Sequence, residues 1–325
     1  MKSTAARFLS LSIAALPMLA PVLPAQAQAW PVKPVRVVVP AGAGGAADIL
    51  ARMLAEPMGA AFSTSFIVDN RPGAGGVIGS EIVARAPGDG YTLMVSSNTL
   101  IIAPSLYRVS YDVQRDFTAI GSIASAPNLL VASPELKVKT LAELIALTRR
   151  TSGGLAYGSP AVGSAAHLTV ELLARAAGIE LVHVPFKSPQ QAMIETISGR
   201  IPLTVAGVSN ALPHLQGGKL VAIANMGAGR SRLVPDVPTP AESGIKGVDL
   251  VLWFGMFAPA STPSALVARI NQQLNAALKS PATLARLESL GFDPAAGTPA
   301  QFNDQVRREE PMFARVVRDS GIKAD

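Results

Sequence analysis

Three glycine-rich turns are the part of the sequence best suited to binding a small molecule. The first, Gly42-Ala43-Gly44-Gly45-Ala46-Ala47, fits the G-x-G-x-x-A pattern of dinucleotide-binding turns, and Asp69 ends the next predicted strand. The second is Gly73-Ala74-Gly75-Gly76, and the third runs from Gly158 to Ser164. Each turn opens a predicted helix, so its backbone N–H groups and the helix dipole can hold a carboxylate as readily as a phosphate.

The first turn taken alone is compatible with a nicotinamide-dependent oxidoreductase. Pro40 argues against it, because it interrupts the passage from the strand into the first glycine. The N-terminal segment argues against it more strongly, because it directs the chain out of the compartment that supplies NAD. We therefore expect no cofactor.

Ser164 and His167 are spaced i, i+3 and raise the alternative of a secreted serine hydrolase, with Ser164 as the nucleophile. The chain has no G-x-S-x-G motif, and a serine directly after Gly163 is well placed to cap a helix. His167, His183 and His214 are the only histidines, and no two of them have metal-ligand spacing. We expect structural histidines, no metal site and no catalysis.

Composition limits the remaining classes. The 325 residues are 49% hydrophobic and 15% charged, which indicates a folded protein of about two domains. Cysteine is absent, which excludes disulfides, thiolate metal sites and a lipoprotein anchor. The formal charge is +6, but basic residues form no long run and aromatic residues are 5%, so we expect no nucleic-acid partner.

Residues 1–29 have the plan of a cleavable secretory signal peptide. Lys2 and Arg7 precede an apolar stretch over 8–23, and two overlapping A-x-A sites follow, with cleavage after Ala27 or Ala29. The apolar stretch is too short and too rich in proline for a membrane span. We therefore expect a periplasmic protein.

Alternating strands and helices position the three turns. Such alternation predicts βαβ units and a mixed, mostly parallel sheet in each of two α/β lobes. The predicted strands are 35–39, 65–68, 91–96, 129–132, 155–158, 181–184, 201–206 and 220–224. The predicted helices are 46–61, 77–85, 140–150, 164–177, 263–278, 281–290 and 299–318.

The chain is expected to cross between the lobes twice. One crossing falls near 122–130 and the return falls near 249–258. This places residues 30–125 and 253–325 in a discontinuous first lobe and residues 126–252 in a second lobe, with a ligand cleft between them.

Several motifs, in order along the chain, resemble the Bug family, the substrate-binding proteins of tripartite tricarboxylate transporters. These motifs are Trp30-Pro31-Val32-Lys33-Pro34-Val35-Arg36, Asp69-Asn70-Arg71-Pro72-Gly73-Ala74-Gly75-Gly76, Ala86-Pro87-Gly88-Asp89-Gly90-Tyr91-Thr92-Leu93, Tyr157-Gly158-Ser159, His183-Val184-Pro185-Phe186-Lys187, Pro235-Asp236-Val237-Pro238-Thr239 and Trp253-Phe254-Gly255. The resemblance covers nearly all of 30–325. It implies a type II periplasmic binding-protein fold, a small carboxylate held by amides and hydroxyls, and delivery to membrane permease subunits.

This chain departs from the family pattern at three places that border the expected cleft. Ala41-Gly42 stands where Phe-Ala is common, Ser188 replaces a usual glycine, and Val208-Ser209-Asn210 lies where an aromatic and acidic pair is common. The ligand is therefore open to variation, and an aromatic acid or a neutral amide such as nicotinamide also suits amide-lined walls.

We expect a monomeric receptor whose ligand is contacted from both lobes. The predicted ligand-binding residues are Ala43, Gly44, Gly45, Gly75, Ser97, Asn98, Thr99, Ser159, Val162, Gly163, Ser164, His167, Phe186, Ser209 and Asn210. Asp48 is expected to stabilise a helix N-terminus, and Arg71 to fasten the second turn or pair with a ligand carboxylate. A ligand-sensing partner of a membrane kinase needs the same cleft and stays an alternative to transport.

Overall fold

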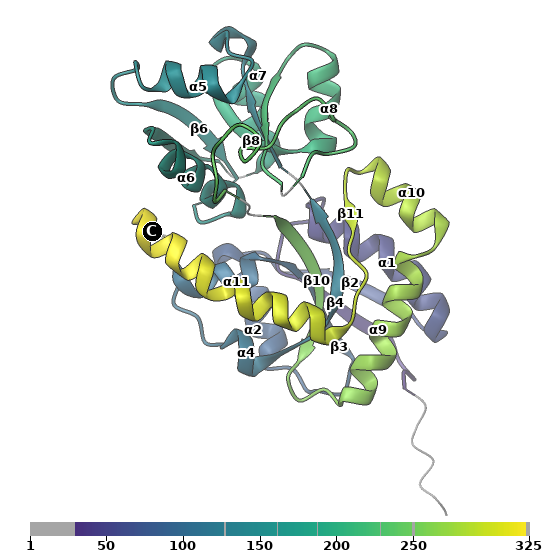
Figure 1. The fold of residues 1–325 in the computed structure, drawn as a ribbon. Coiled ribbons are helices and arrows are strands. Elements are labelled where there is room, and N and C mark those ends of the chain that lie inside the picture. The colour runs from purple at the N-terminus through teal and green to yellow at the C-terminus, as the bar shows by residue number, and fades with distance from the viewer. Residues whose placement is uncertain are drawn as a thin grey trace, which may run out of the picture.

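The computed structural model describes residues 30–126, 128–160, 162–186, 188–227, 229–248 and 251–322. They form two α/β lobes, one above the other in Figure 1. The predicted signal peptide, 1–29, lies outside the described residues. Among the helices of the described part, none is long and apolar enough to span a bilayer.

Lobe 1 is built on a six-stranded mixed sheet in the order β11-β4-β10-β3-β1-β2. β1 pairs in parallel with β2 and β3, whereas β10 runs antiparallel to β3 and β4, and β11 antiparallel to β4. The strands are β1 (Val35–Val39), β2 (Phe66–Asn70), β3 (Thr92–Ser97), β4 (Phe117–Ala126), β10 (Leu252–Pro259) and β11 (Asp293–Pro294).

Lobe 2 is built on a five-stranded mixed sheet in the order β7-β6-β8-β5-β9. β6 pairs in parallel with β7 and β8, and β5 pairs antiparallel with β8 and β9. The strands are β5 (Asn128–Ala132), β6 (Leu155–Ser159), β7 (Leu181–Pro185), β8 (Leu203–Gly207) and β9 (Val221–Asn225).

Helices cover both faces of each sheet because neighbouring strand residues point to opposite sides. In lobe 1, Val37 packs in one core beneath α1, α9 and α10, and Val38 packs in the other beneath α2, α3 and α11. In lobe 2, Leu130 faces α5 and α6, whereas Leu129 faces α7 and α8. The helices are α1 (Ala46–Phe62), α2 (Val77–Ala84), α3 (Thr99–Ile102), α4 (Val113–Asp116), α5 (Leu141–Thr148), α6 (Ala165–Ala177), α7 (Pro189–Ile197), α8 (Val208–Gln216), α9 (Ser264–Leu278), α10 (Pro281–Ser289) and α11 (Pro299–Ser320), with short 3₁₀ turns at Ala74–Gly76, Ala103–Ser105 and Pro134–Leu136.

The chain leaves the lobe 1 sheet at Ala126 and enters the lobe 2 sheet at Asn128. It returns between β9 and β10, so the last strands and helices complete lobe 1. On this basis we propose the lobe boundaries expected from the sequence, 30–125 with 253–325 and 126–252.

The predicted strands and helices are all present, with small shifts at their ends. Thr140 caps α5, because Thr140 Oγ1 accepts a hydrogen bond from Glu143 N at 3.2 Å. Among the strands, β4, β10 and β11 were not predicted from the sequence, and among the helices α3, α4, α7 and α8 were not predicted. β10 supplies two of the three antiparallel pairings of lobe 1, because it lies between β3 and β4 and pairs with both.

Candidate ligand-binding site

The first glycine turn follows β1 and is fixed by a buried carboxylate. Gly44 N donates to Asp48 Oδ2 at 2.8 Å, and Arg52 Nε lies 2.9 Å from Asp48 Oδ1. Burial raises the pKa of Asp48, but hydrogen bonds from Arg52, Gly44 and Asn70 outweigh burial and hold this pKa below its usual value. The predicted role of Asp48 at the helix N-terminus is confirmed. Ala43 and Gly44 are exposed at the tip of the turn.

The second turn requires glycine at two positions. Gly75 and Gly76 have φ of +62° and +94°, in the region that favours glycine. A Cβ on Gly75 would lie 2.6 Å from Tyr107 Cε2, and one on Gly76 would lie 3.1 Å from Pro40 O. The turn is therefore pressed against both the first turn and the Tyr107 ring.

The end of β3 joins these two turns. Ser97 Oγ and Thr99 Oγ1 are 3.0 Å apart, and a Cβ on Gly76 would lie 3.9 Å from Thr99 Oγ1. Asn98 is fully buried, and its Nδ2 donates to Val251 O at 3.3 Å, next to the return crossing. Because β1, β2 and β3 are parallel, their carboxyl ends share one edge, where the structure brings these predicted residues together.

The third turn, in lobe 2, is held by the first turn of α6. Ser164 Oγ accepts a hydrogen bond from His167 N at 3.2 Å, which confirms the predicted N-cap. His167 Nδ1 accepts from Gly163 N at 2.9 Å. Neither contact leaves His167 in position to take a proton from Ser164, so the hydrolase alternative based on this pair is wrong.

Two stacked imidazoles lie beneath this turn. The rings of His167 and His183 are 3.7 Å apart and nearly parallel, and His183 Nε2 lies 2.7 Å from Ser159 Oγ. Burial and the neighbouring His183 lower the pKa of His167 to about 3, and burial lowers the pKa of His183 to about 4. Both rings are therefore neutral at neutral pH.

A buried tyrosine extends the same cluster. Tyr157 OH donates to Glu171 Oε1 at 2.7 Å, and His167 Nε2 lies 3.8 Å from the same oxygen. Burial, followed by the hydrogen bond to Glu171 and its charge, raises the pKa of Tyr157, so the phenol keeps its proton and acts as a donor. We call Tyr157, Ser159, His167, Glu171 and His183 the lobe 2 polar cluster.

The other predicted residues of lobe 2 follow the ends of β7 and β8. Phe186 N donates to Ser159 O at 2.8 Å, and its ring packs against Gly158. Ser209 and Asn210 begin α8, and Ser209 N would lie 3.2 Å from a Cβ on Gly291 of lobe 1. Val162 is half-buried beside the third turn, while Lys187, part of the resemblance, lies outside the described residues.

The two sets of loops meet across the lobes. A Cβ placed on Gly163 would overlap Leu106 Cδ1, so the Leu106 side chain occupies the space that a residue with a side chain would need. Ala165 and Leu168 of α6 share a core cluster with Phe313 and Val317 of α11, which runs below α6 in Figure 1. The edges that carry the predicted donors therefore face each other.

Three residues of the site were not predicted from the sequence: Leu106, Tyr107 and Glu171. Glu171 was detectable in principle, because it lies four residues after His167 and so on the same helix face. Leu106 and Tyr107 had no such signal, because their role depends on glycines far away in the sequence. Among the described residues, no three His, Asp or Glu side chains are grouped closely enough to hold a metal ion.

Comparisons with known proteins agree with this architecture. Residues 50–321 match the family described as "Tripartite tricarboxylate transporter family receptor". "Protein BugT" of Bordetella pertussis is 33% identical over 92% of this chain and 93% of its own length.

Two solved structures show the same fold with a bound ligand. "R. palustris Rpa4515 with adipate" has a TM-score of 0.82 at 33% identity and covers 90% of this chain and 99% of its own. "MatC (Rpa3494) from Rhodopseudomonas palustris with bound malate" has a TM-score of 0.79 at 30% identity and covers 89% of this chain and 100% of its own. The chain therefore belongs to the tripartite tricarboxylate transporter receptor family, as its resemblance to Bug proteins predicted, and is a solute-binding protein rather than an enzyme.

Proposed function

We propose that this protein is a periplasmic receptor that captures a small organic carboxylate between its lobes and delivers it to permease subunits of a tripartite transporter. The observation that carries the proposal is the pair of donor-bearing loop sets at the carboxyl ends of β1–β3 and β6–β8, which face each other across the lobes. The relatives with bound adipate and malate support a carboxylate as the ligand class.

The charges around the loops favour recognition by neutral donors. Asp69 accepts hydrogen bonds from Arg36 Nε at 2.7 Å and from Arg71 Nε at 3.0 Å. Both guanidinium groups are therefore paired within lobe 1. Arg52 is likewise engaged by Asp48. A ligand carboxylate would then be held by turn amides, by hydroxyls such as Thr99 Oγ1, and by the positive end of the α6 dipole.

Binding would proceed by closure of the lobes. Lobe 1 holds the ligand first through Ala43, Gly45, Gly75, Ser97 and Thr99, and the third turn then completes the donor shell. A ligand shifts the equilibrium towards the closed state only to the extent that it binds this state more tightly. The closed form presents the surface that the permease recognises.

A thermal-shift screen of the purified protein tests the ligand class. Adipate, malate, benzoate and nicotinamide form the first panel, and a bound ligand must raise the melting temperature in a dose-dependent way. A shift with a carboxylate and none with the amide supports the proposal. A shift with nicotinamide alone would replace carboxylate by amide as the ligand class.

A pair of variants tests where on the protein the ligand binds. Thr99→Val removes one hydroxyl at the carboxyl end of β3, and we expect it to weaken the best ligand about tenfold. Thr64→Val is the control, because Thr64 precedes β2 at the opposite end of the sheet. Equal affinities in the two variants would place the ligand elsewhere.

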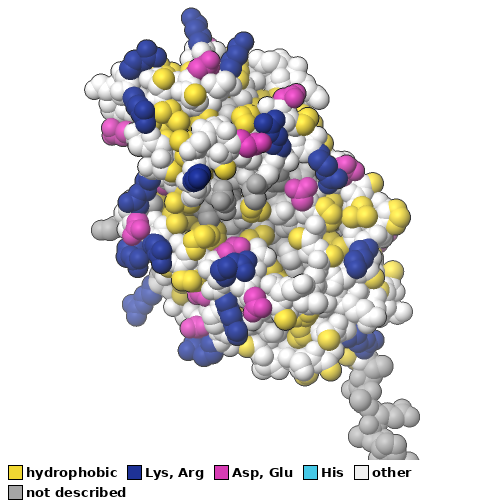
Figure 2. All heavy atoms as spheres, in the orientation of Figure 1, with side chains coloured by type: hydrophobic (Ala, Val, Ile, Leu, Met, Phe, Trp, Pro, Cys, Tyr) yellow, Lys and Arg dark blue, Asp and Glu magenta, His cyan; other side chains and the backbone are white. Residues whose placement is uncertain are grey.

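The remaining parts of the proposal have direct tests of their own. N-terminal sequencing of the exported protein checks cleavage after Ala27 or Ala29. Light scattering coupled to size exclusion checks the monomer. On the face in Figure 2, Lys and Arg are interspersed with Asp and Glu over both lobes, which agrees with a small-molecule ligand rather than nucleic acid.

A further inference from the structure

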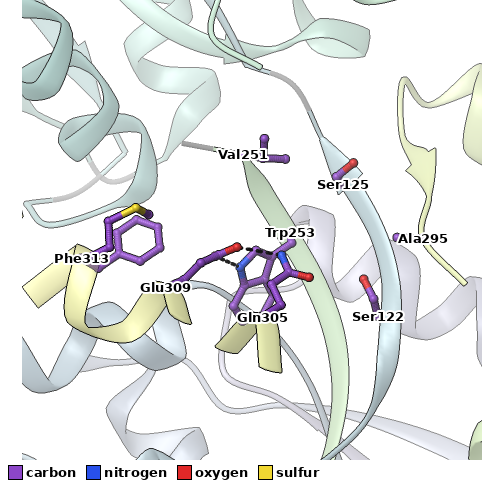
Figure 3. Close-up of a pocket in the computed structure, with 9 residues that line it drawn as sticks. Ser122, Ser125, Val251, Trp253, Ala295, Gln305, Glu309 and Phe313 are labelled. Carbon is purple, nitrogen blue, oxygen red and sulfur yellow. Dashed lines mark hydrogen bonds between the residues drawn. The ribbon is translucent and has the colours of Figure 1, made fainter. Parts of the chain in front are cut away.

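A cavity beside the return crossing has a lining distinct from the predicted ligand residues. Its volume is about 310 Å³, and it is bounded by α11 and by the strands β4, β10 and β11 (Figure 3). None of the fifteen residues predicted to contact the ligand lines it. A volume at the lower end of the range of ligand pockets suits a small molecule.

The cavity carries an unbalanced negative charge. Glu309 is the charged side chain among the described residues that line it. Trp253 Nε1 donates to Glu309 Oε2 at 2.6 Å, and Gln305 Nε2 donates to Oε1 at 2.9 Å, as the dashed lines in Figure 3 show. Both donors are neutral, and in the part of the chain that the structure describes no basic group forms an ion pair with Glu309.

The carboxylate retains capacity for another donor. An ionised carboxylate offers about four lone-pair positions, of which the two neutral donors use two. The Ser122 and Ser125 hydroxyls of β4 line the same cavity and can also accept hydrogen bonds. An ammonium group, which has donors and no acceptor, is complementary to this set.

The remaining walls are apolar and aromatic. Trp253 and Phe313 are buried, and Met312 is 40% exposed at the rim. The accessible side chain of Met312 can cover a short alkyl chain. An anion would be repelled by Glu309, so this cavity has the opposite charge preference to the interlobe site.

We propose that this cavity binds a small organic ammonium ion, with its charge at Glu309 and its alkyl chain against Met312 at the rim. The inference is independent of the carboxylate proposal, because the two sites share none of the named residues. It assigns a second ligand class to the protein.

Trp253 fluorescence tests the inference directly. The chain has two tryptophans, so Trp30→Phe leaves Trp253 as the one indole that reports on the cavity. We expect n-butylammonium chloride to change its emission saturably, with a Kd in the millimolar range, at constant ionic strength. n-Butanol and sodium butyrate, which have similar size and lack the cationic group, are expected to produce no saturable change.

Two variants in the Trp30→Phe background connect the response to the charge. Glu309→Gln keeps the size and an acceptor for Trp253, and we expect at least tenfold weaker binding. Glu310→Gln is the matched control, because Glu310 Oε2 accepts from Gln114 outside the cavity lining, and its affinity should be unchanged. No saturable response to butylammonium, an equal response to n-butanol, or an equal loss in both variants would overturn the inference, and the n-butanol comparison holds even if Glu309→Gln fails to fold.

Discussion

The proposed ligand donors of the two lobes are held in place by different physical means. Lobe 1 uses backbone amides in turns whose shape depends on glycine, and its charged side chains serve to tie those turns down. Lobe 2 uses the polar cluster, in which neutral side chains hold one another beneath the third turn. The difference teaches that lobe 1 depends on backbone shape at its glycines, whereas lobe 2 depends on keeping two imidazoles uncharged.

The largest expected effect is on the contact between the lobes. Gly163→Ala places a methyl group where Leu106 now lies, so we expect at least tenfold weaker ligand binding and loss of compaction in small-angle scattering. Gly153→Ala is the matched control, because Gly153 has φ of +77° and open space around it, whereas Gly163 has φ of +70°. Both carry the same backbone strain, and only one carries the clash.

A double variant sharpens this test. Leu106→Ala in the Gly163→Ala background removes the obstructing side chain, and we expect it to restore part of the affinity. If Gly163→Ala binds the ligand as tightly as Gly153→Ala does, the Leu106 contact does not limit closure.

The second expected effect is a difference between the lobes in how their stability depends on pH. The pKa values of His167 and His183 in the folded protein, about 3 and 4, lie below their unfolded value of 6.5, so the unfolded state binds more protons between these limits. The stability from the neutral pair is therefore complete above pH 6.5 and is lost as the pH falls towards 4. The contribution of Asp48 has a different pH dependence. Because its pKa is lowered, the stability that ionised Asp48 provides is lost only below about pH 4.

We expect the melting temperature to fall by roughly 5–10 °C between pH 7 and pH 4.5. His183→Gln keeps a hydrogen-bonding partner for Ser159 without a titrating ring. In this variant the melting temperature should therefore depend less steeply on pH. His214→Gln is the control, because His214 lies on α8 outside the cluster. Equal slopes in both variants would rule out the His pair as the source of the acid sensitivity.

The third effect is on the first turn of lobe 1. Asp48→Asn removes the charge that accepts from Gly44 N, and hydrogen bonds to charged groups contribute about 1.5–3 kcal/mol. Differential scanning calorimetry should show a melting temperature lower by roughly 3–6 °C. Asp89→Asn changes an exposed carboxylate that accepts from Tyr91 N and should shift it by less than about 1 °C.

The smallest effect concerns Arg71. Its Nε donates to Asp69 from a half-exposed side chain, and exposed ion pairs contribute about 0–1 kcal/mol. Arg71→Gln should lower the melting temperature by less than about 2 °C and leave adipate or malate affinity within a factor of two. A tenfold loss of affinity would show that Arg71 pairs with the ligand carboxylate instead of fastening the turn.

The same contrast explains what could be predicted from the sequence. The second turn of lobe 1 was predictable because positive φ favours glycine, which leaves a visible pattern at Gly73, Gly75 and Gly76. The Ser164 cap was predictable because capping is local. The stacked histidines were not, because His167 and His183 meet only when α6 packs on the β6–β7 pair.

Two central strands were missed for a related reason. β4 contains Gly121, Ser122 and Ser125, and β10 contains Gly255, so neither reads as a continuous apolar or alternating run. Their pairing is also irregular, with register shifts at Phe254/Gly255 and Met256/Phe257. A Cβ on Gly255 would overlap the Phe302 ring of α11, so this glycine reflects helix packing rather than strand propensity.

The position of β10 also sets an order of assembly. β10 lies between β3 and β4, yet it is synthesised after every strand of lobe 2. Because the chain is synthesised from its N-terminus, β3 and β4 each have an open edge until β10 is made. Such edges are sites of mispairing between chains. Lobe 2 can complete its sheet from one continuous stretch, whereas lobe 1 must wait for residues 252–259. The need for protection against aggregation before folding is complete therefore falls on the N-terminal part of lobe 1, which is synthesised before β10.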